Sequence, residues 1–86
     1  MKYAIRFSRE AAADIDTLYH SDRKLFARIL NKINSLEGNP EEGKQLVGNH
    51  KGEYFLRVGN YRIVYELDQA KHTTYILTIK HRKHVY

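Results

Sequence analysis

The feature that most constrains this chain is a pair of alternating apolar and polar runs joined by Gly59-Asn60, EYFLRVGNYRIVYE, at residues 53–66. Two such runs separated by two residues that tolerate positive φ predict a β-hairpin with a tight turn. Because side chains alternate between the faces of a strand, Arg57 and Arg62 point together to one face and the large apolar residues to the other. The turn sets the register, whose predicted pairs are Val58–Tyr61, Arg57–Arg62, Leu56–Ile63, Phe55–Val64 and Tyr54–Tyr65.

The arginine pair needs an explanation, because like charges directly opposite each other destabilise a sheet by up to about 1 kcal/mol. One interpretation is that Arg57 and Arg62 hold an anion between them. The other is that both are solvated cations on an exposed face, paired with Glu53 or Glu66. The hairpin alone leaves both interpretations open.

Composition narrows the choice of partner. The chain has 86 residues, no cysteine and a formal net charge of +5, which excludes disulfide and thiolate sites and favours a polyanionic or acidic partner. The positive charge gathers at the end of the chain, because residues 80–86 (KHRKHVY) contain no acid. No apolar run approaches the roughly 20 residues of a membrane span, and the first residues lack the apolar stretch of a signal peptide. We therefore expect a cytoplasmic protein.

Around the hairpin, the sequence predicts an α+β fold in a single domain spanning residues 1–86. Residues 2–8 alternate as a half-buried strand. Two helices follow, one capped by Ser8 and ending near Tyr19, the other capped by Ser21 or Asp22 and ending near Glu37. Residues 39–52 predict a loop, and strands follow at residues 54–58, 61–68 and 73–80. The order β-α-α-β-β-β predicts an N-terminal strand, an antiparallel two-helix hairpin and a three-stranded antiparallel meander.

The last strand and the tail extend the basic surface. If Tyr75, Leu77 and Ile79 face the core, one permitted register places Lys80 beside Arg62. The tail then brings further polar groups to the same end of the sheet, namely His81, Arg82, His84 and Tyr86. Guanidinium, imidazole and phenol groups together suit a phosphodiester and the movement of protons around it, or the stacking of an unpaired base. A metal held by His81 and His84 is the weaker interpretation, since no acid or cysteine lies near them.

The ordered set QLVGN, EYFLRVGNYRIVYEL and IKHRKHVY, after two N-terminal helices, resembles the RelE/ParE superfamily of bacterial and archaeal toxins over essentially the whole chain. The strand YRIVY and the closing HRKHVY are most similar to the RelE branch. The resemblance implies a toxin neutralised by an antitoxin. In the RelE branch it implies a ribonuclease that cuts mRNA in the ribosomal A site, without metal or other cofactor, by attack of a 2′-hydroxyl on the adjacent phosphate.

Position by position, the resemblance implies roles for the basic residues. Arg57 and Arg62 match phosphate-holding residues, Arg82 an arginine near the leaving group, and Tyr86 a base or a stacking partner. Two positions depart from the pattern: Phe55 stands where a lysine is usual, and Lys80 replaces a common glycine. Proton transfer would then fall on Tyr86 with help from a histidine, or activity would be weak. The expected catalytic residues are Arg57, Arg62, Arg82, Tyr86, His81 and His84, and the expected RNA-binding residues are Lys80, Lys83, Arg57 and Arg62.

The resemblance also implies partners. We expect a RelB-like antitoxin, acidic or amphipathic, that places a helix on the toxin in a hetero-oligomer, together with mRNA and the ribosome and no membrane. A second hypothesis is a ParE-like toxin that binds DNA gyrase and cuts nothing. A third is a degenerate member kept as an antitoxin partner or RNA-binding module.

Overall fold

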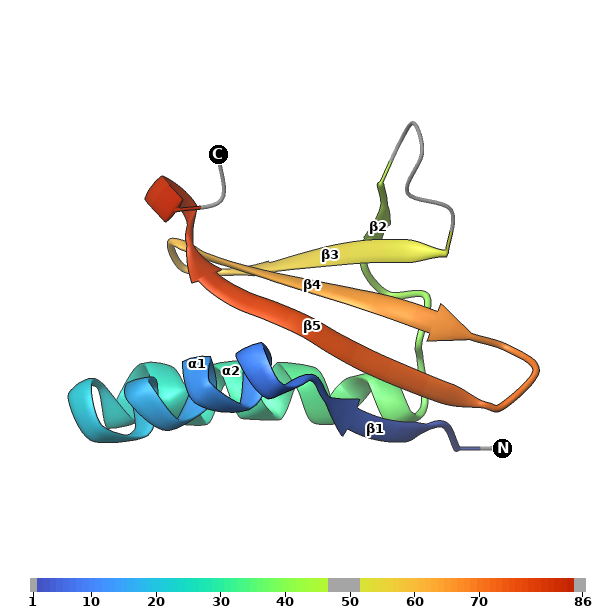
Figure 1. Ribbon diagram of the computed structural model, residues 1–86, viewed down its shortest axis with the longest axis horizontal. Coiled ribbons are helices and arrows are strands. Elements are labelled where there is room, and N and C mark those ends of the chain that lie inside the picture. The colour runs from blue at the N-terminus through green and yellow to red at the C-terminus, as the bar shows by residue number, and fades with distance from the viewer. Residues whose placement is uncertain (1, 47–51, 85–86) are drawn as a thin grey trace.

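Two helices cover one face of a five-stranded sheet, and the tail lies on the other side (Figure 1). The computed structural model describes residues 2–46 and 52–84. Its elements are β1 (Ala4–Phe7), α1 (Arg9–Ser21), α2 (Arg23–Asn34), the 3-10 helix η1 (Ser35–Glu37), β2 (Lys44–Gln45), β3 (Glu53–Val58), β4 (Tyr61–Asp68), β5 (Thr73–His81) and the 3-10 helix η2 (Arg82–His84). The predicted α+β order, with its helical hairpin and its β3–β4–β5 meander, is confirmed.

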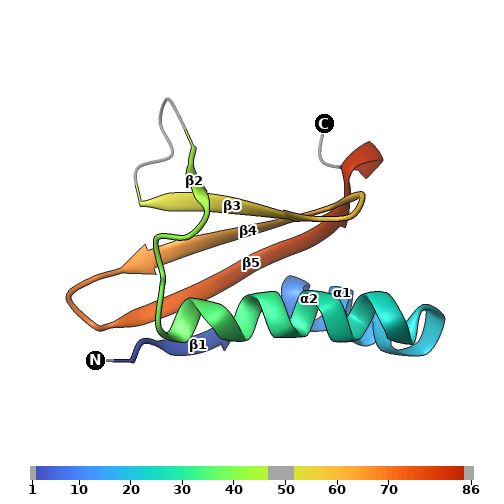
Figure 2. The ribbon, with the colours of Figure 1, turned by 180° about the vertical axis from the view of Figure 1, so that it is seen from behind.

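The sheet has the strand order β1-β5-β4-β3-β2 and is mixed, because β1 pairs with β5 in parallel while the other pairs are antiparallel. The helical hairpin connects β1 to the rest of the chain, and α1 follows β1 and packs against β5. Seen from behind, α2 lies in front of α1 on the same side of the sheet (Figure 2). The sequence predicted β1 as a strand but did not give its partner.

Both helices begin at the predicted caps. The Ser8 hydroxyl accepts the Ala11 N–H at 2.9 Å and donates to the Leu77 carbonyl at 2.7 Å, so one side chain starts α1 and ties it to β5. Asp22 is the only residue between the helices: its carboxylate accepts the Leu25 N–H at 3.1 Å. The first helix therefore runs two residues beyond the predicted end near Tyr19.

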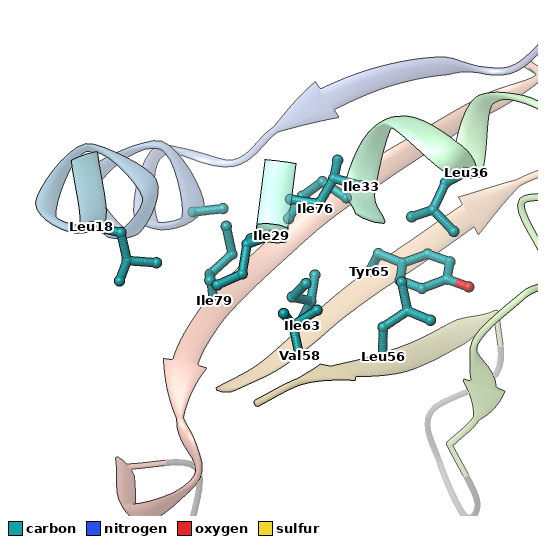
Figure 3. Close-up of a cluster of buried hydrophobic side chains, with 11 residues drawn as sticks. Leu18, Ile29, Ile33, Leu36, Leu56, Val58, Ile63, Tyr65, Ile76 and Ile79 are labelled. Atoms are coloured by element: carbon teal, nitrogen blue, oxygen red, sulfur yellow. The ribbon is translucent and has the colours of Figure 1, made fainter. Parts of the chain in front are cut away.

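The hairpin forms in the predicted register, with Arg57 opposite Arg62 and Phe55 opposite Val64. Gly59 has φ 59°, the left-handed conformation that the tight turn requires. The face opposite the arginines packs against α2 and η1 to form the core (Figure 3). Its fully buried members include Ile29, Ile33, Leu36, Ile63, Tyr65 and Ile76.

The predicted facing of β5 is correct only at its end. A β-bulge between Val64 and Tyr65 in the β4–β5 ladder pairs Tyr65 with Ile76 and leaves Leu77 without a partner in the register. The extra residue reverses the alternation, so Ile79 is buried as predicted, but Ile76 rather than Tyr75 or Leu77 fills the core. Beyond the bulge, Lys80 pairs with Arg62 in the register that the sequence permitted.

The segment predicted as a loop contains the short edge strand β2, which pairs with β3. Buried Tyr65 holds this segment: its hydroxyl donates to the Pro40 carbonyl at 2.9 Å and accepts the Gly43 N–H at 3.0 Å. Leu46 is half-buried, and its N–H bonds the Glu53 carbonyl at 2.9 Å. Val47, the other predicted core contact in this segment, lies outside the described residues.

Candidate functional site

The sheet face turned away from the helices, which carries Arg57 and Arg62, has a hollow of about 360 Å³ at the Gly59–Asn60 end. Three elements build it: the β3–β4 hairpin, its turn, and the start of η2. The lining residues are Arg57, Gly59, Asn60, Tyr61, Arg62, Arg82 and Lys83. Four of these seven residues are cations and none is an acid, so the hollow is built for an anion.

An aromatic ring organises the two facing arginines. The guanidinium carbon of Arg62 lies 4.5 Å from the centroid of the Phe55 ring, and that of Arg57 lies 5.9 Å from it. Both distances fall within the range of cation–π attraction, which offsets part of the repulsion between the two charges. The guanidinium groups are thereby held on the open face, with Arg57 exposed and Arg62 half-buried.

The tail reaches the hollow because β5 continues past the hairpin turn. The Arg82 N–H donates to the Asn60 carbonyl at 2.8 Å, which fixes the start of η2 against the turn. Exposed Arg82 and Lys83 then line the same hollow as Arg57 and Arg62. The sequence prediction that the tail arginine lies beside the paired arginines is confirmed.

His81 lies on the other side of the strand. It pairs with Tyr61 across β4 and β5, and the two rings meet edge to face with centroids 5.4 Å apart. It lines a separate hollow of about 300 Å³, together with Asp14 and Thr17 of α1. His81 is not among the described residues that line the arginine hollow, although its Nδ1 accepts the N–H of Lys83, which does line that hollow, at 3.2 Å. His84 belongs to η2 but its side chain is outside the described part of the structure, as is all of Tyr86.

Lys80 stands beside Arg62 in the ladder, but its ammonium group is engaged elsewhere. It bonds Asp14 Oδ1 at 2.6 Å and lies 3.3 Å from Glu10 Oε2, both on α1. The hydrogen bond to Asp14 and the two carboxylate charges raise the pKa of Lys80. The Asp14 carboxylate also accepts the Ile79 N–H at 3.0 Å, at the edge of β5 that β1 leaves uncovered. Lys80 thus keeps its predicted place beside Arg62 in the ladder, while its ammonium group joins β5 to α1. Its predicted role in RNA binding stays a prediction.

Sequence reasoning missed several contributors to this surface. Tyr61 packs against the core and also lines the hollow, together with Asn60 of the turn. Lys44 was placed in a loop, but it pairs with Phe55 as part of β2. The signal for β2 is weak because only two residues pair.

Two further observations concern metal binding and membrane insertion. Within residues 2–46 and 52–84, no group of three or more histidine and carboxylate side chains is placed to hold a metal ion. Over the same part of the chain, none of the helices has the length and apolar character to cross a membrane.

Comparison with known proteins gives consistent matches. Residues 5–86 match the model of the family described as the ParE toxin of the type II toxin–antitoxin system, parDE. Toxin RelG of Mycobacterium tuberculosis is 32% identical over 87 residues, covering 100% of this chain and 98% of that protein.

Solved structures agree with these matches. The RelBE2 toxin–antitoxin complex of the same species contains a chain 28% identical, with a TM-score of 0.81 over 95% of this chain and 100% of that one. The YoeB dimer of Staphylococcus aureus is 27% identical, with a TM-score of 0.77 over 93% and 97% of the two chains.

Proposed function

The chain belongs to the ParE toxin family of type II toxin–antitoxin systems, within the RelE/ParE superfamily, and from that premise we propose that it is an endoribonuclease that cuts mRNA in the ribosomal A site. The observation that carries the proposal is the hollow in which Arg57, Arg62 and Arg82 converge on an open sheet face. A surface built only to bind a protein does not require three guanidinium groups around one hollow, whereas a reacting phosphate does.

The proposed reaction is transfer within the RNA strand. The 2′-oxygen attacks the adjacent phosphorus, the bond from phosphorus to the 5′-oxygen breaks, and the products are a 2′,3′-cyclic phosphate and a free 5′-hydroxyl. Negative charge grows on the phosphoryl oxygens as five oxygens surround phosphorus. Arg57 and Arg62, opposed at the floor of the hollow, would stabilise that charge, and Arg82 at its rim would face the leaving oxygen.

Two protons must move: one leaves the 2′-hydroxyl and one joins the departing 5′-oxygen. Tyr86 and His84 are the proposed donors and acceptors, because both closely follow in sequence Arg82 and Lys83, which line the hollow. His81 is the less favoured candidate, since it is not among the described residues that line the arginine hollow. Nearby cations would lower the pKa of a tail phenol and make it a better base.

We also propose a cytoplasmic toxin with a cognate antitoxin. Chains of this fold have been solved in the RelBE2 complex and as the YoeB–YefM heterotetramer of Staphylococcus aureus, which is 24% identical with a TM-score of 0.75. An acidic or amphipathic antitoxin segment would neutralise the toxin by covering the basic hollow or by displacing the tail.

Primer extension on a message under translation tests the proposal. Wild-type protein should produce cuts at A-site codons, and Arg62→Ala and Tyr86→Phe should abolish or strongly reduce them while the variants stay folded. Lys2→Ala is the matched control, because Lys2 is exposed and precedes β1, outside the hollow. An intact message in the presence of wild-type protein that still arrests growth would refute the assignment.

A second candidate, a toxin that inhibits DNA gyrase, is supported by the description of the matching family, which names the ParE toxin. In that case the cations of the hollow would bind a protein or DNA and the tail tyrosine would have no chemical task. Inhibition of purified gyrase by wild-type protein, retained in Tyr86→Phe, would establish this candidate, and unaffected gyrase would exclude it.

A further inference from the structure

Lys44 occupies a defined place on the open face. It is an exposed residue of the edge strand β2 and pairs with Phe55, whose ring carries the two arginines of the hollow. Directly paired residues project from the same face of a sheet, and neighbouring strands lie about 4.8 Å apart. Lys44 is paired with Phe55 across β2 and β3, and the Phe55 ring reaches Arg62 diagonally on β4. The aromatic ring therefore lies between the two cations.

The backbone around Lys44 is held from within the core. Tyr65 bonds both Pro40 and Gly43 through its buried hydroxyl. Gly43 also comes so close to β3 that a Cβ there would lie 2.6 Å from the Phe55 carbonyl oxygen and 2.7 Å from the Tyr65 hydroxyl. Only glycine fits this approach. The residue that follows, Lys44, is thus placed beside Phe55 by buried contacts.

The surroundings leave the charge of Lys44 available. Lys44 and Arg57 line a hollow of about 380 Å³ next to Phe55, and Arg57 also lines the first hollow, so the two hollows meet at this residue. The acid in the second hollow, Glu42, forms an ion pair with Lys32, and that hydrogen bond lowers the pKa of Glu42. Within the described part of the chain, the Lys44 ammonium group has no carboxylate partner.

We propose that Lys44 is a positioning residue that binds a phosphate of the mRNA strand next to the reacting phosphate, so that the strand runs from the first hollow across β3 to β2. This inference rests on the proposed function. A cationic path beside an aromatic ring is the arrangement by which proteins hold single-stranded nucleic acid. The competing role is structural, because a lysine on an edge strand also discourages pairing with other sheets.

The test is single-turnover cleavage of a synthetic message on programmed ribosomes at sub-saturating toxin, measured over a range of salt concentrations. Lys44→Gln should lower kcat/KM about 3- to 10-fold and reduce the dependence of log(kcat/KM) on log[salt] by about 0.7, the effect of one lost contact with a single-strand phosphate. Lys71→Gln loses the same charge at the β4–β5 turn, which lies at the end of the sheet away from the β3–β4 turn and the first hollow (Figure 1), and should behave as wild type. Thermal unfolding shows that both variants are folded.

Neutral linkages identify which RNA carries the phosphate. Methylphosphonates are placed one at a time on either side of the cleaved linkage. If Lys44 contacts the message, a methylphosphonate at one position should lower the cleavage rate of the wild-type protein as much as Lys44→Gln does. The same methylphosphonate should not lower the rate of the Lys44→Gln variant any further. If a methylphosphonate lowers the cleavage rates of the wild type and of Lys44→Gln by the same factor at every position of the message, the contact of Lys44 is with ribosomal RNA. That result would overturn the proposal.

An unchanged rate and salt dependence in Lys44→Gln would also overturn it while leaving the nuclease function intact. Absence of cleavage by the wild-type protein would refute the proposed function and this inference with it.

Discussion

Replacement of Tyr65 by phenylalanine tests how the site is held in place. The change keeps the ring, which stacks on Tyr54 with centroids 5.5 Å apart, and removes only the hydroxyl. Two hydrogen bonds are lost, one donated to the Pro40 carbonyl and one accepted from the Gly43 N–H. Both backbone groups belong to residues 38–43, the connector between η1 and β2, and both lose their partner where the connector meets the sheet. At about 0.5–1.5 kcal/mol for each bond, the free energy of unfolding should fall by about 1–3 kcal/mol.

Urea and thermal unfolding measure this loss, and each kcal/mol corresponds to a fall in Tm of about 4–8 °C in a domain of this size. Tyr54→Phe is the matched control, because among the described residues the Tyr54 hydroxyl has no hydrogen bond. The control should lie within about 0.5 kcal/mol of wild type. A Tyr65→Phe variant as stable as the Tyr54→Phe control would refute the argument that this hydroxyl holds the connector.

The pH dependence gives an independent check. Burial raises the pKa of Tyr65 from 10.0 to about 12 in the folded protein. Between these values the unfolded chain loses the phenolic proton and the folded chain keeps it, so this stabilisation is complete below pH 10 and disappears as pH rises towards 12. The stability difference between wild type and Tyr65→Phe should be constant below pH 10 and shrink above it. A difference that stays constant up to pH 12 would contradict the raised pKa.

Three further predictions concern the supports of the hollow. Gly43→Ala should lower the free energy of unfolding by about 1–3 kcal/mol, because its Cβ would overlap Phe55 and Tyr65; Gly38→Ala, which meets nothing within 4 Å, is the control in urea unfolding, and equal stabilities would refute the prediction. Asp14→Ala should cost about 1–3 kcal/mol, because the Ile79 N–H loses its acceptor and Lys80 keeps only Glu10; thermal unfolding tests it, with exposed Asp16→Ala as the neighbouring control. Phe55→Leu should slow single-turnover RNA cleavage about 2- to 5-fold through loss of the cation–π contacts, and an unchanged rate would show that the ring does not orient the arginines.

The sequence predicted the elements and the hairpin register because these depend on local rules. Alternation and a turn of fixed length decide which residues oppose each other, so the Arg57–Arg62 pair was readable from Gly59 and Asn60. The bulge at Leu77 could not be predicted from the sequence, because an extra residue in a strand leaves a continuous apolar pattern unchanged. One inserted residue was enough to exchange Leu77 for Ile76 in the core.

Side-chain partners were predicted less well than strand partners. The register placed Lys80 beside Arg62, but the acids that bind it come from α1, more than 60 residues earlier in the chain. The same limit applies to Lys44, whose position depends on a hydroxyl of β4 that holds the connector. Long-range contacts of this kind follow from the packing of helices on the sheet, which the local pattern does not specify.

The distribution of acids gives a physical answer to the question raised by the paired arginines. Two lysines near the open face are matched by carboxylates: Lys80 by Asp14 and Glu10, and Lys32 by Glu42. Among the described residues, none of those that line the hollow is an acid. Neutral borders around a basic centre concentrate the electrostatic potential there, because fields from paired charges largely cancel at a distance. A phosphate bound between Arg57 and Arg62 would offset the repulsion between their charges. On this argument, phosphate should stabilise the folded protein against heat, and Arg57→Gln should raise stability without phosphate while abolishing that response.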